Sequence, residues 1–165
     1  MNPKIITPAT QVIDLTRAKL QCKITGSDRD AELADAIAAA RDYAEAFLGL
    51  PVGEQVLQYT YRTWCGRAVL PCDVTEVLSV TAAGAPVLPL PVADGRTLTL
   101  TAVAPVVVTI KCGWTAATLP ATVKQAMLLL ITDLIRNPQA QSDVELFRNQ
   151  AFENMLWPHR ERLPL

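Results

Sequence analysis

Residues 113–137 have the sequence GWTAATLPATVKQAMLLLITDLIRN. It joins a Gly-Trp turn, a Leu-Pro pair and a long apolar run, and Pro138 follows directly. Proline suits the first position of a helix because no amide hydrogen is left unpaired there, and it stops a helix that reaches it from the other side. The sequence therefore predicts a helix from Pro120 to Arg136.

This predicted helix is apolar around most of its circumference. At about 100° per residue, its apolar positions cover an arc of roughly 260°. Its main stripe is Val123, Met127, Leu130 and Leu134, and the flank outside that stripe contains Leu128 and Ile131. A helix of this kind is covered on more than one side. Two arrangements stay open: the helix lies between a sheet and other helices of its own chain, or a neighbouring subunit covers the flank.

Two helices are predicted before residue 50. Asp14 can cap a short helix over residues 15–22, and a longer helix is expected to begin with Ser27 as its N-cap and Asp30 as the acid of a capping box. Gly49 is predicted to end the longer helix in a left-handed conformation. The apolar residues of the longer helix fall on one face: Leu33, Ile37, Ala40, Ala44 and Phe47.

Residues 55–112 are predicted to form an antiparallel β meander. Strands are indicated over residues 55–64 and 77–81, and the sequences AAGAP and ADG, at 82–86 and 93–95, are turn signals. After the second turn, threonines alternate with apolar residues, and the same period continues through Val106, Val108 and Ile110. Turns this close together favour antiparallel pairing over parallel βαβ units.

The last predicted helix follows a capping box formed by Ser142 and Glu145 and continues to about Trp157, where Pro158 ends it. Its apolar face is expected to contain Val144, Phe147, Ala151 and Met155. The chain is thus predicted to be an α+β protein with N-terminal helices, a central antiparallel meander and two C-terminal helices packed as one domain. The expected parts of this single domain, 1–165, are helical 1–50, β 55–112, helical 118–157 and a tail 158–165.

Composition and charge exclude several classes of protein. The chain has 165 residues, 50% hydrophobic and 19% charged, with a formal net charge of -1. Tight DNA binding is disfavoured because no basic cluster is present to contact phosphates. The longest apolar run, residues 126–131, is far shorter than the roughly 18 residues of a membrane helix. The N-terminus has no secretory core, so the chain is expected to fold in a cytosol, without a membrane.

Residues that could carry catalysis or bind a metal are sparse. The one histidine, His159, follows a helix-stopping proline in the tail and is expected to be a surface residue. No phosphate loop, GxSxG, HExxH or dinucleotide-binding fingerprint is present. The four cysteines, Cys22, Cys65, Cys72 and Cys112, are expected to be buried reduced thiols, although Cys65 and Cys72 flank a tight connection. We therefore expect no catalytic residues, no cofactor and no metal.

The order of these features resembles the head-tail connector (adaptor) proteins of long-tailed double-stranded DNA bacteriophages, prophages and gene transfer agents. The resemblance is carried by IDLTRAKLQCKITGSDRDAELADAIAAARDYAEAFLG at the N-terminus, by VTIKCGWTAATLPATVKQAMLLLITDLIRN and by the closing NMLWPHRERL. It covers most of the chain, and residues 55–100 are its least typical part. The alternatives are a small-ligand-binding or enzymatic cytosolic α+β domain and, less favoured by charge, a regulatory DNA-binding protein.

The resemblance implies a non-enzymatic virion protein that is made in the bacterial cytoplasm and placed at the head-tail neck. It implies a ring of about twelve subunits in closed symmetry. The ring would lie beneath the portal protein, extend the DNA channel without sequence-specific binding, and present a surface to a stopper or tail-completion protein. The candidate contacts with the portal or a neighbouring subunit are Leu128, Ile131, Phe152, Leu156, Trp157, Arg160, Arg162 and Leu163. For the tail, two states stay open: disorder without a partner, or ordering on a partner through its aliphatic and arginine side chains.

Overall fold

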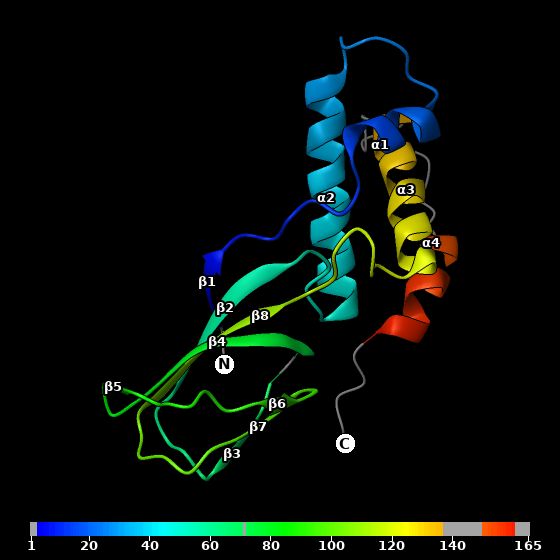
Figure 1. Ribbon diagram of the computed structural model, residues 1–165. Helices are drawn as coiled ribbons and strands as arrows, with labels where there is room; N and C mark the ends of the chain where they lie inside the picture. Colours follow the sequence, from blue (N-terminus) through cyan, green and yellow to red (C-terminus); the bar gives the residue numbers. More distant parts are fainter. Residues whose placement is uncertain (1–2, 71, 137–149, 161–165) are drawn as a thin grey trace. The chain divides into compact units, whose positions relative to one another are not determined.

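The computed structural model describes residues 3–70, 72–136 and 150–160 (Figure 1). The chain divides into two compact units. The sheet unit contains residues 1–10 and 53–115, and the helical unit contains residues 11–52 and 116–165. The predicted β segment, residues 55–112, lies in the sheet unit, and the single domain stays a prediction. The α+β class with antiparallel strands is confirmed.

The sheet unit contains two antiparallel sheets. The five-stranded sheet has the order β1 (Lys4–Thr7), β2 (Gln55–Tyr61), β8 (Val106–Cys112), β4 (Val74–Ala82) and β5 (Ala85–Pro86). The three-stranded sheet has the order β3 (Arg67–Val69), β7 (Thr97–Thr99) and β6 (Ala93–Asp94). The order differs from a simple meander because β8, the last strand in the chain, lies between β2 and β4. Its alternate residues Val106, Val108, Ile110 and Cys112 are buried, as the period of two predicts.

Strand β1 was not expected from the sequence. It pairs with β2, and all four of its residues are exposed. Its two apolar residues, Ile5 and Ile6, lie on the surface, so no buried face marks it as a strand in the sequence. Backbone pairing alone reveals it. The strand predicted to reach Trp64 instead ends at Tyr61, and the Trp64 indole nitrogen donates to the Leu100 carbonyl at 2.7 Å.

The Gly-Trp turn at residues 113 and 114 brings two chain segments into close contact. Gly113 has a φ of 96°, which favours glycine, and a side chain there would place Cβ 2.1 Å from the Gly53 carbonyl oxygen. Gly53 and Trp114 form a β-bridge beside this contact, and the Thr10 amide donates to the Glu54 carbonyl at 2.9 Å. The turn therefore requires glycine for conformation and for space.

The helical unit is built from α1 (Leu15–Cys22), α2 (Asp30–Leu48), α3 (Ala121–Arg136) and α4 (Gln150–Leu156), followed by a 3-10 turn at Trp157–His159. Two predicted caps are confirmed. The Asp14 side chain accepts from the Arg17 amide, and Gly49 ends α2 with a φ of 71°. The predicted N-cap Ser27 is wrong, because α2 begins after Arg29. Asp30, the expected partner in that capping box, instead pairs with Lys19 of α1.

Helix α3 is covered by the helices of its own unit. It packs against α1, α2 and α4 (Figure 1). Seven of its residues are buried: Val123, Ala126, Met127, Leu128, Ile131, Thr132 and Ile135. The flank residues Leu128 and Ile131 are therefore core, while Leu134, expected in the main stripe, is 39% exposed. Packing against three helices accounts for the wide apolar arc without a neighbouring subunit.

The buried face of α4 lies one residue away from the predicted one. Phe152 and Leu156 are buried, whereas Ala151 is exposed and Met155 is half-buried. The predicted capping box and the first half of the predicted face, residues 142–147, lie outside the described residues. The large Phe152 ring sets the orientation of the helix, because it packs between aromatic side chains of α2.

Candidate interface on the helical unit

The C-terminal segment of the helical unit is held to α2 by aromatic contacts. The ring of Phe152 lies edge-on to the rings of Tyr43 and Phe47, with centroids 5.2 and 6.4 Å away. Tyr43 and Phe47 are four residues apart on α2, so they lie on the same side of the helix. Edge-to-face pairs of this kind add about 0.5–1.5 kcal/mol beyond the burial of apolar area. They fix α4 against the C-terminal half of α2.

Arg160 continues this contact to the surface. Its guanidinium lies 5.5 Å from the centroid of Phe47 and 5.4 Å from that of Trp157. Both distances allow a cation–π interaction. Trp157 remains 57% exposed and Tyr43 49% exposed. We call Tyr43, Phe47, Trp157 and Arg160 the Trp157 surface.

His159, the residue before Arg160, contacts α3. Its Nε2 atom lies 2.6 Å from the Thr122 hydroxyl, at the start of that helix. His159 was expected to be a surface residue of the tail, and it is half-buried. The 3-10 turn is thus tied to α2 through Arg160 and to α3 through His159. The structure describes the tail as far as Arg160, and residues 161–165 lie outside the described residues.

The structure separates the predicted contact residues into three groups. Leu128, Ile131, Phe152 and Leu156 are buried within the helical unit and offer no surface to a partner. Trp157 and Arg160 are exposed and lie together. Arg162 and Leu163 lie outside the described residues. Sequence reasoning missed Tyr43 and assigned Phe47 to the core; the spacing of these two aromatic residues on α2 was the available signal.

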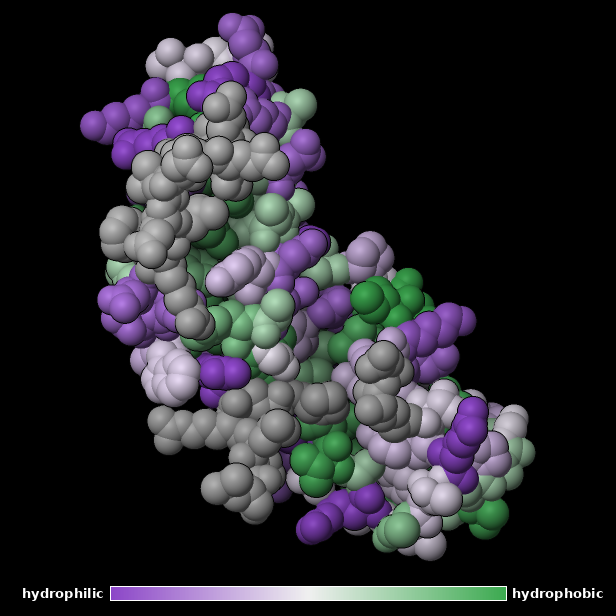
Figure 2. All heavy atoms as spheres, turned by 180° about the vertical axis from the view of Figure 1, so that it is seen from behind, coloured by the Kyte–Doolittle hydropathy of each residue, from purple (hydrophilic) through white to green (hydrophobic). Residues whose placement is uncertain are grey.

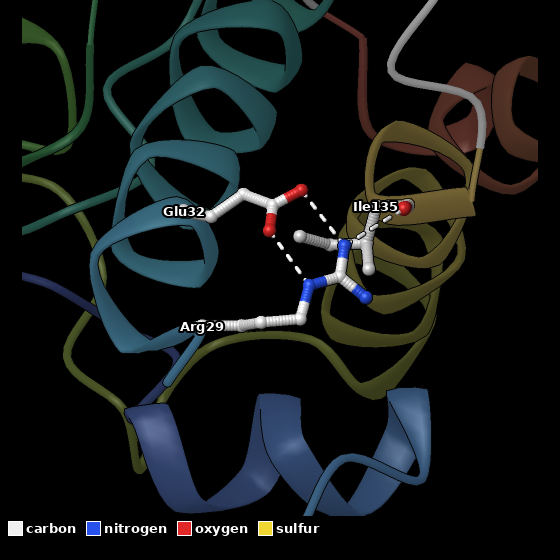
Figure 3. Close-up of polar contacts among 3 residues, drawn as sticks. All are labelled: Arg29, Glu32 and Ile135. Atoms are coloured by element: carbon white, nitrogen blue, oxygen red, sulfur yellow. Dashed lines mark hydrogen bonds and ion pairs between the residues drawn. The ribbon is translucent and has the colours of Figure 1, made fainter. Parts of the chain in front are cut away.

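A second polar contact joins the beginning of α2 to the end of α3 (Figure 3). Arg29 donates from Nε and Nη2 to the two carboxylate oxygens of Glu32, at 2.7 and 2.8 Å, and from Nη2 to the Ile135 carbonyl at 3.2 Å. That carbonyl belongs to the last turn of α3, where no backbone amide of the helix can reach it. The hydrogen bond from Arg29 lowers the pKa of Glu32, and the same bond raises the pKa of Arg29. Arg29 therefore acts as a clamp between helices.

Several charged side chains of the described residues are arranged in pairs of opposite sign. The ion pairs are Lys19–Asp30, Arg29–Glu32, Arg41–Asp42, Arg96–Asp73 and Lys111–Glu54. Figure 2 shows the molecule from behind relative to Figure 1, and hydrophilic and hydrophobic residues are interspersed on this face. A basic stripe for phosphate binding would need unpaired cations side by side. These pairs place each of five cations beside an acid instead.

The described residues contain no group of three or more His, Cys, Asp or Glu side chains that could hold a metal ion. Cys72 and Cys112 are buried as expected, whereas Cys65 is exposed and Cys22 is only partly buried, so the expectation of burial is wrong for these two. Within residues 3–70, 72–136 and 150–160, every helix is too short or too polar to span a bilayer. The expected absence of catalysis, cofactor and metal stays a prediction.

Comparison with known proteins relates the N-terminal half of the chain to phage proteins. Residues 12–71 match the model of the phage gp6-like head-tail connector protein family. The head completion protein gp6 of Enterobacteria phage HK97 is 47% identical over 45 residues, which are 27% of this chain and 42% of that protein. The matched segment thus spans less than half of the length of this curated relative.

Comparison of structures covers the whole chain. A chain from the neck of an empty gene transfer agent particle, computed with C6 symmetry, has a TM-score of 0.78 at 15% identity, over 100% of this chain and 98% of that one. A chain from the virion of the native particle has the same score and coverage at 19% identity. A chain from the native neck, computed with C12 symmetry, has a TM-score of 0.69 at 18% identity, over 99% and 98% of the two chains. The expected resemblance is confirmed: the chain is similar to phage head-tail connector proteins in sequence over residues 12–71, and it has the fold of gene transfer agent neck proteins.

Proposed function

We propose that the protein is a non-catalytic structural component of a virion that connects the head to the tail. The observation that carries the proposal is the match of residues 12–71 to the gp6-like head-tail connector family. This segment includes α1 and α2 of the helical unit, and six apolar residues of α2 are buried there. The fold shared with gene transfer agent neck chains supports the same role. The protein would be made in the host cytoplasm and reside at the neck.

The proposed assembly is a ring of about twelve copies beneath the portal protein. Support comes from the C6 and C12 symmetry with which the neck structures of the similar chains were computed. Copies in a closed ring contact one another through two different surfaces, so each copy needs two complementary faces. The side of the ring away from the portal would receive a stopper or tail-completion protein.

DNA is proposed to pass through this ring without sequence-specific binding. The formal net charge of -1 and the pairing of exposed cations with acids support this view. Strong phosphate contacts would hold DNA in place, since affinity grows with each phosphate that a protein neutralises. A channel wall of paired charges lets the duplex move.

The Trp157 surface is proposed to bind the portal. Tryptophan, tyrosine and arginine dominate the energetics of protein interfaces, and this surface presents all three. Arg160 stacks on Trp157, which orders both long side chains before a partner arrives and reduces the entropy lost on binding. Arg162 and Leu163 follow directly in the sequence, and we include them in the proposed contact. The matching portal surface would combine an apolar pocket with carboxylates.

Deleting the gene tests the role itself. Lysates without the protein should contain heads that lack tails, and the protein supplied from a plasmid should restore tailed particles. Labelled copies should be found at the neck by electron microscopy. Infectious tailed particles produced in the absence of the protein would refute the connector role.

A surface variant tests the portal contact. Trp157→Ala should leave the circular dichroism spectrum unchanged, because the side chain is 57% exposed, and reduce tailed particles at least tenfold. Leu20→Ala is the matched control, since Leu20 is 67% exposed on α1 and away from the Trp157 surface. Removal of residues 161–165 tests Arg162 and Leu163 in the same assay. Normal tailing by Trp157→Ala, or equal loss by the control, would contradict the assignment.

A further inference from the structure

Two cysteine side chains meet in the interior of the sheet unit. Cys112 is the last residue of β8 and is fully buried, and Cys72 lies two residues before β4 with 2% of its surface exposed. The first residue of β4, Val74, is the cross-strand partner of Cys112, which brings the two segments together. The Cys112 thiol is hydrogen-bonded to the Cys72 sulfur. Neither the connector role nor the fold requires a thiol at either position.

The surroundings make the two sulfurs unequal. Hydrogen bonds from Cys112 and from the Tyr59 hydroxyl, together with the charge of Arg96, lower the pKa of the Cys72 thiol, against the opposite effects of burial and Asp73. Burial raises the pKa of Tyr59, so its hydroxyl stays protonated and remains a donor. Thiolate character governs the reactivity of a cysteine. The lowered pKa favours the Cys72 thiolate, so we assign Cys72 as the nucleophile and Cys112 as its resolving partner.

We propose that Cys72 and Cys112 form a latent disulfide, reduced when the chain folds and closed by a peroxide once the protein meets an oxidising environment. A disulfide requires backbones that approach closely, and the pairing of Val74 with Cys112 brings the chain two residues after Cys72 alongside Cys112. Both cysteines are buried, whereas Cys65 is exposed.

The reaction balances with hydrogen peroxide as the oxidant. The Cys72 thiolate attacks one peroxide oxygen, the O–O bond breaks, and hydroxide leaves and takes up the thiol proton as water. The Cys72 sulfenic acid is then attacked by the Cys112 sulfur, which forms the S–S bond and releases a second water. Two thiols are oxidised by two electrons in all, and one peroxide is reduced to two waters. Peroxide is small enough to reach the site through local opening of the sheet unit.

The bond would join the chain just before β4 to the end of the central strand β8. It would close the segment 72–112, which contains β4, β5, β6 and β7, and would restrict the unfolding of both sheets. Disulfides persist outside the cytosol and are reduced within it. Formation of the Cys72–Cys112 disulfide when a particle is released rests on the proposed function, whereas the reaction with peroxide does not.

The experiment uses the purified full-length chain with and without hydrogen peroxide. After denaturation and labelling with N-ethylmaleimide, the reduced chain should carry four labels, one for each free cysteine. The oxidised chain should carry two labels, and peptide mass mapping should find Cys72 linked to Cys112. The melting temperature of the oxidised chain should rise by roughly 5–10 °C, as expected for a loop of this length.

Matched variants give the controls. Cys72→Ser and Cys112→Ser should each abolish the intramolecular link, while Cys22→Ser should retain it. If either core variant fails to fold, the peptide map of the unmodified chain decides alone. A link from Cys72 to Cys65, links between chains, or no link after peroxide would each overturn the proposal. Because no particle is needed, any of these failures leaves the connector role untouched.

Discussion

The burial of Leu128 leads to a prediction that separates folding from assembly. Leu128 lies on α3 with 1% of its surface exposed, in a helix packed against α1, α2 and α4. Leu128→Ala removes the apolar side chain and leaves a cavity that the neighbouring helices fill only in part. Such substitutions cost about 2.7–5.0 kcal/mol, the larger values where the surroundings cannot collapse. We expect the helical unit to lose stability in this range.

Leu134→Ala is the matched control because it makes the same change on the same helix, at a side chain that is 39% exposed. Less apolar surface is returned to water there, and we expect a cost of about 1 kcal/mol or less. At roughly 2–4 °C for each kcal/mol in a chain of this size, the two variants should differ in melting temperature by about 4–15 °C.

The assay is thermal and urea unfolding followed by the helical circular dichroism signal, with ring assembly measured separately. Leu128→Ala should melt well below Leu134→Ala. Any loss of ring assembly by Leu128→Ala should then be proportional to the fraction of its chains that are unfolded. The reasoning fails if Leu128→Ala melts like the control and yet prevents ring formation, because Leu128 would then be covered by a neighbouring subunit in the assembled protein.

Two further substitutions each test one contact, the close approach of Gly113 to Gly53 in the sheet unit and the Arg29–Glu32 ion pair in the helical unit. Gly113→Ala should destabilise the sheet unit by several kcal/mol in urea unfolding, because its Cβ would meet the Gly53 carbonyl at 2.1 Å. The control is Gly84→Ala, which is also at positive φ but has open space around it and should cost about 1–2 kcal/mol. Equal costs for the two variants would contradict the close approach of Gly113 to Gly53. Arg29→Gln should lower the melting temperature at pH 7, where Glu32 is ionised. This difference should shrink as the pH falls through the titration of Glu32, whose pKa is lowered in the folded state, and the part due to the hydrogen bond with the Ile135 carbonyl should remain. A difference that does not change with pH would exclude the ion pair as a cause.

Local sequence signals predicted the features that depend on neighbouring residues. Asp14 and Gly49 act within one turn of the helices that they bound, and both predictions are confirmed. The alternation along β8 follows from the geometry of a single strand, and its buried positions are correct. The Ser27 cap is wrong because α2 begins at Asp30, and Asp30 pairs with Lys19, a residue of another helix. A capping motif in the sequence does not report such a competing partner.

Features that join distant segments were not accessible in the same way. The place of β8 between β2 and β4 depends on pairings between distant residues, such as Gln55 with Cys112. The contact of Arg160 with Phe47 joins the two chain segments of the helical unit, and no spacing in the sequence indicates it. The apolar arc of α3 was recognised, but its hydrophobicity is the same whether a helix of this chain or a neighbouring subunit covers it. Only the packing of α1, α2 and α4 assigns Leu128 and Ile131 to the core.

This assignment limits where a ring contact can lie. A side chain that already fills the core cannot also contact a neighbour without exposing that core. The contacts of the proposed ring must therefore come from exposed side chains, such as the apolar residues Leu88, Val92 and Val103 of the sheet unit. These lie outside the stripe that stabilises α3. Stability and assembly should thus be separable by mutation, with α3 substitutions acting on folding and surface substitutions acting on the ring.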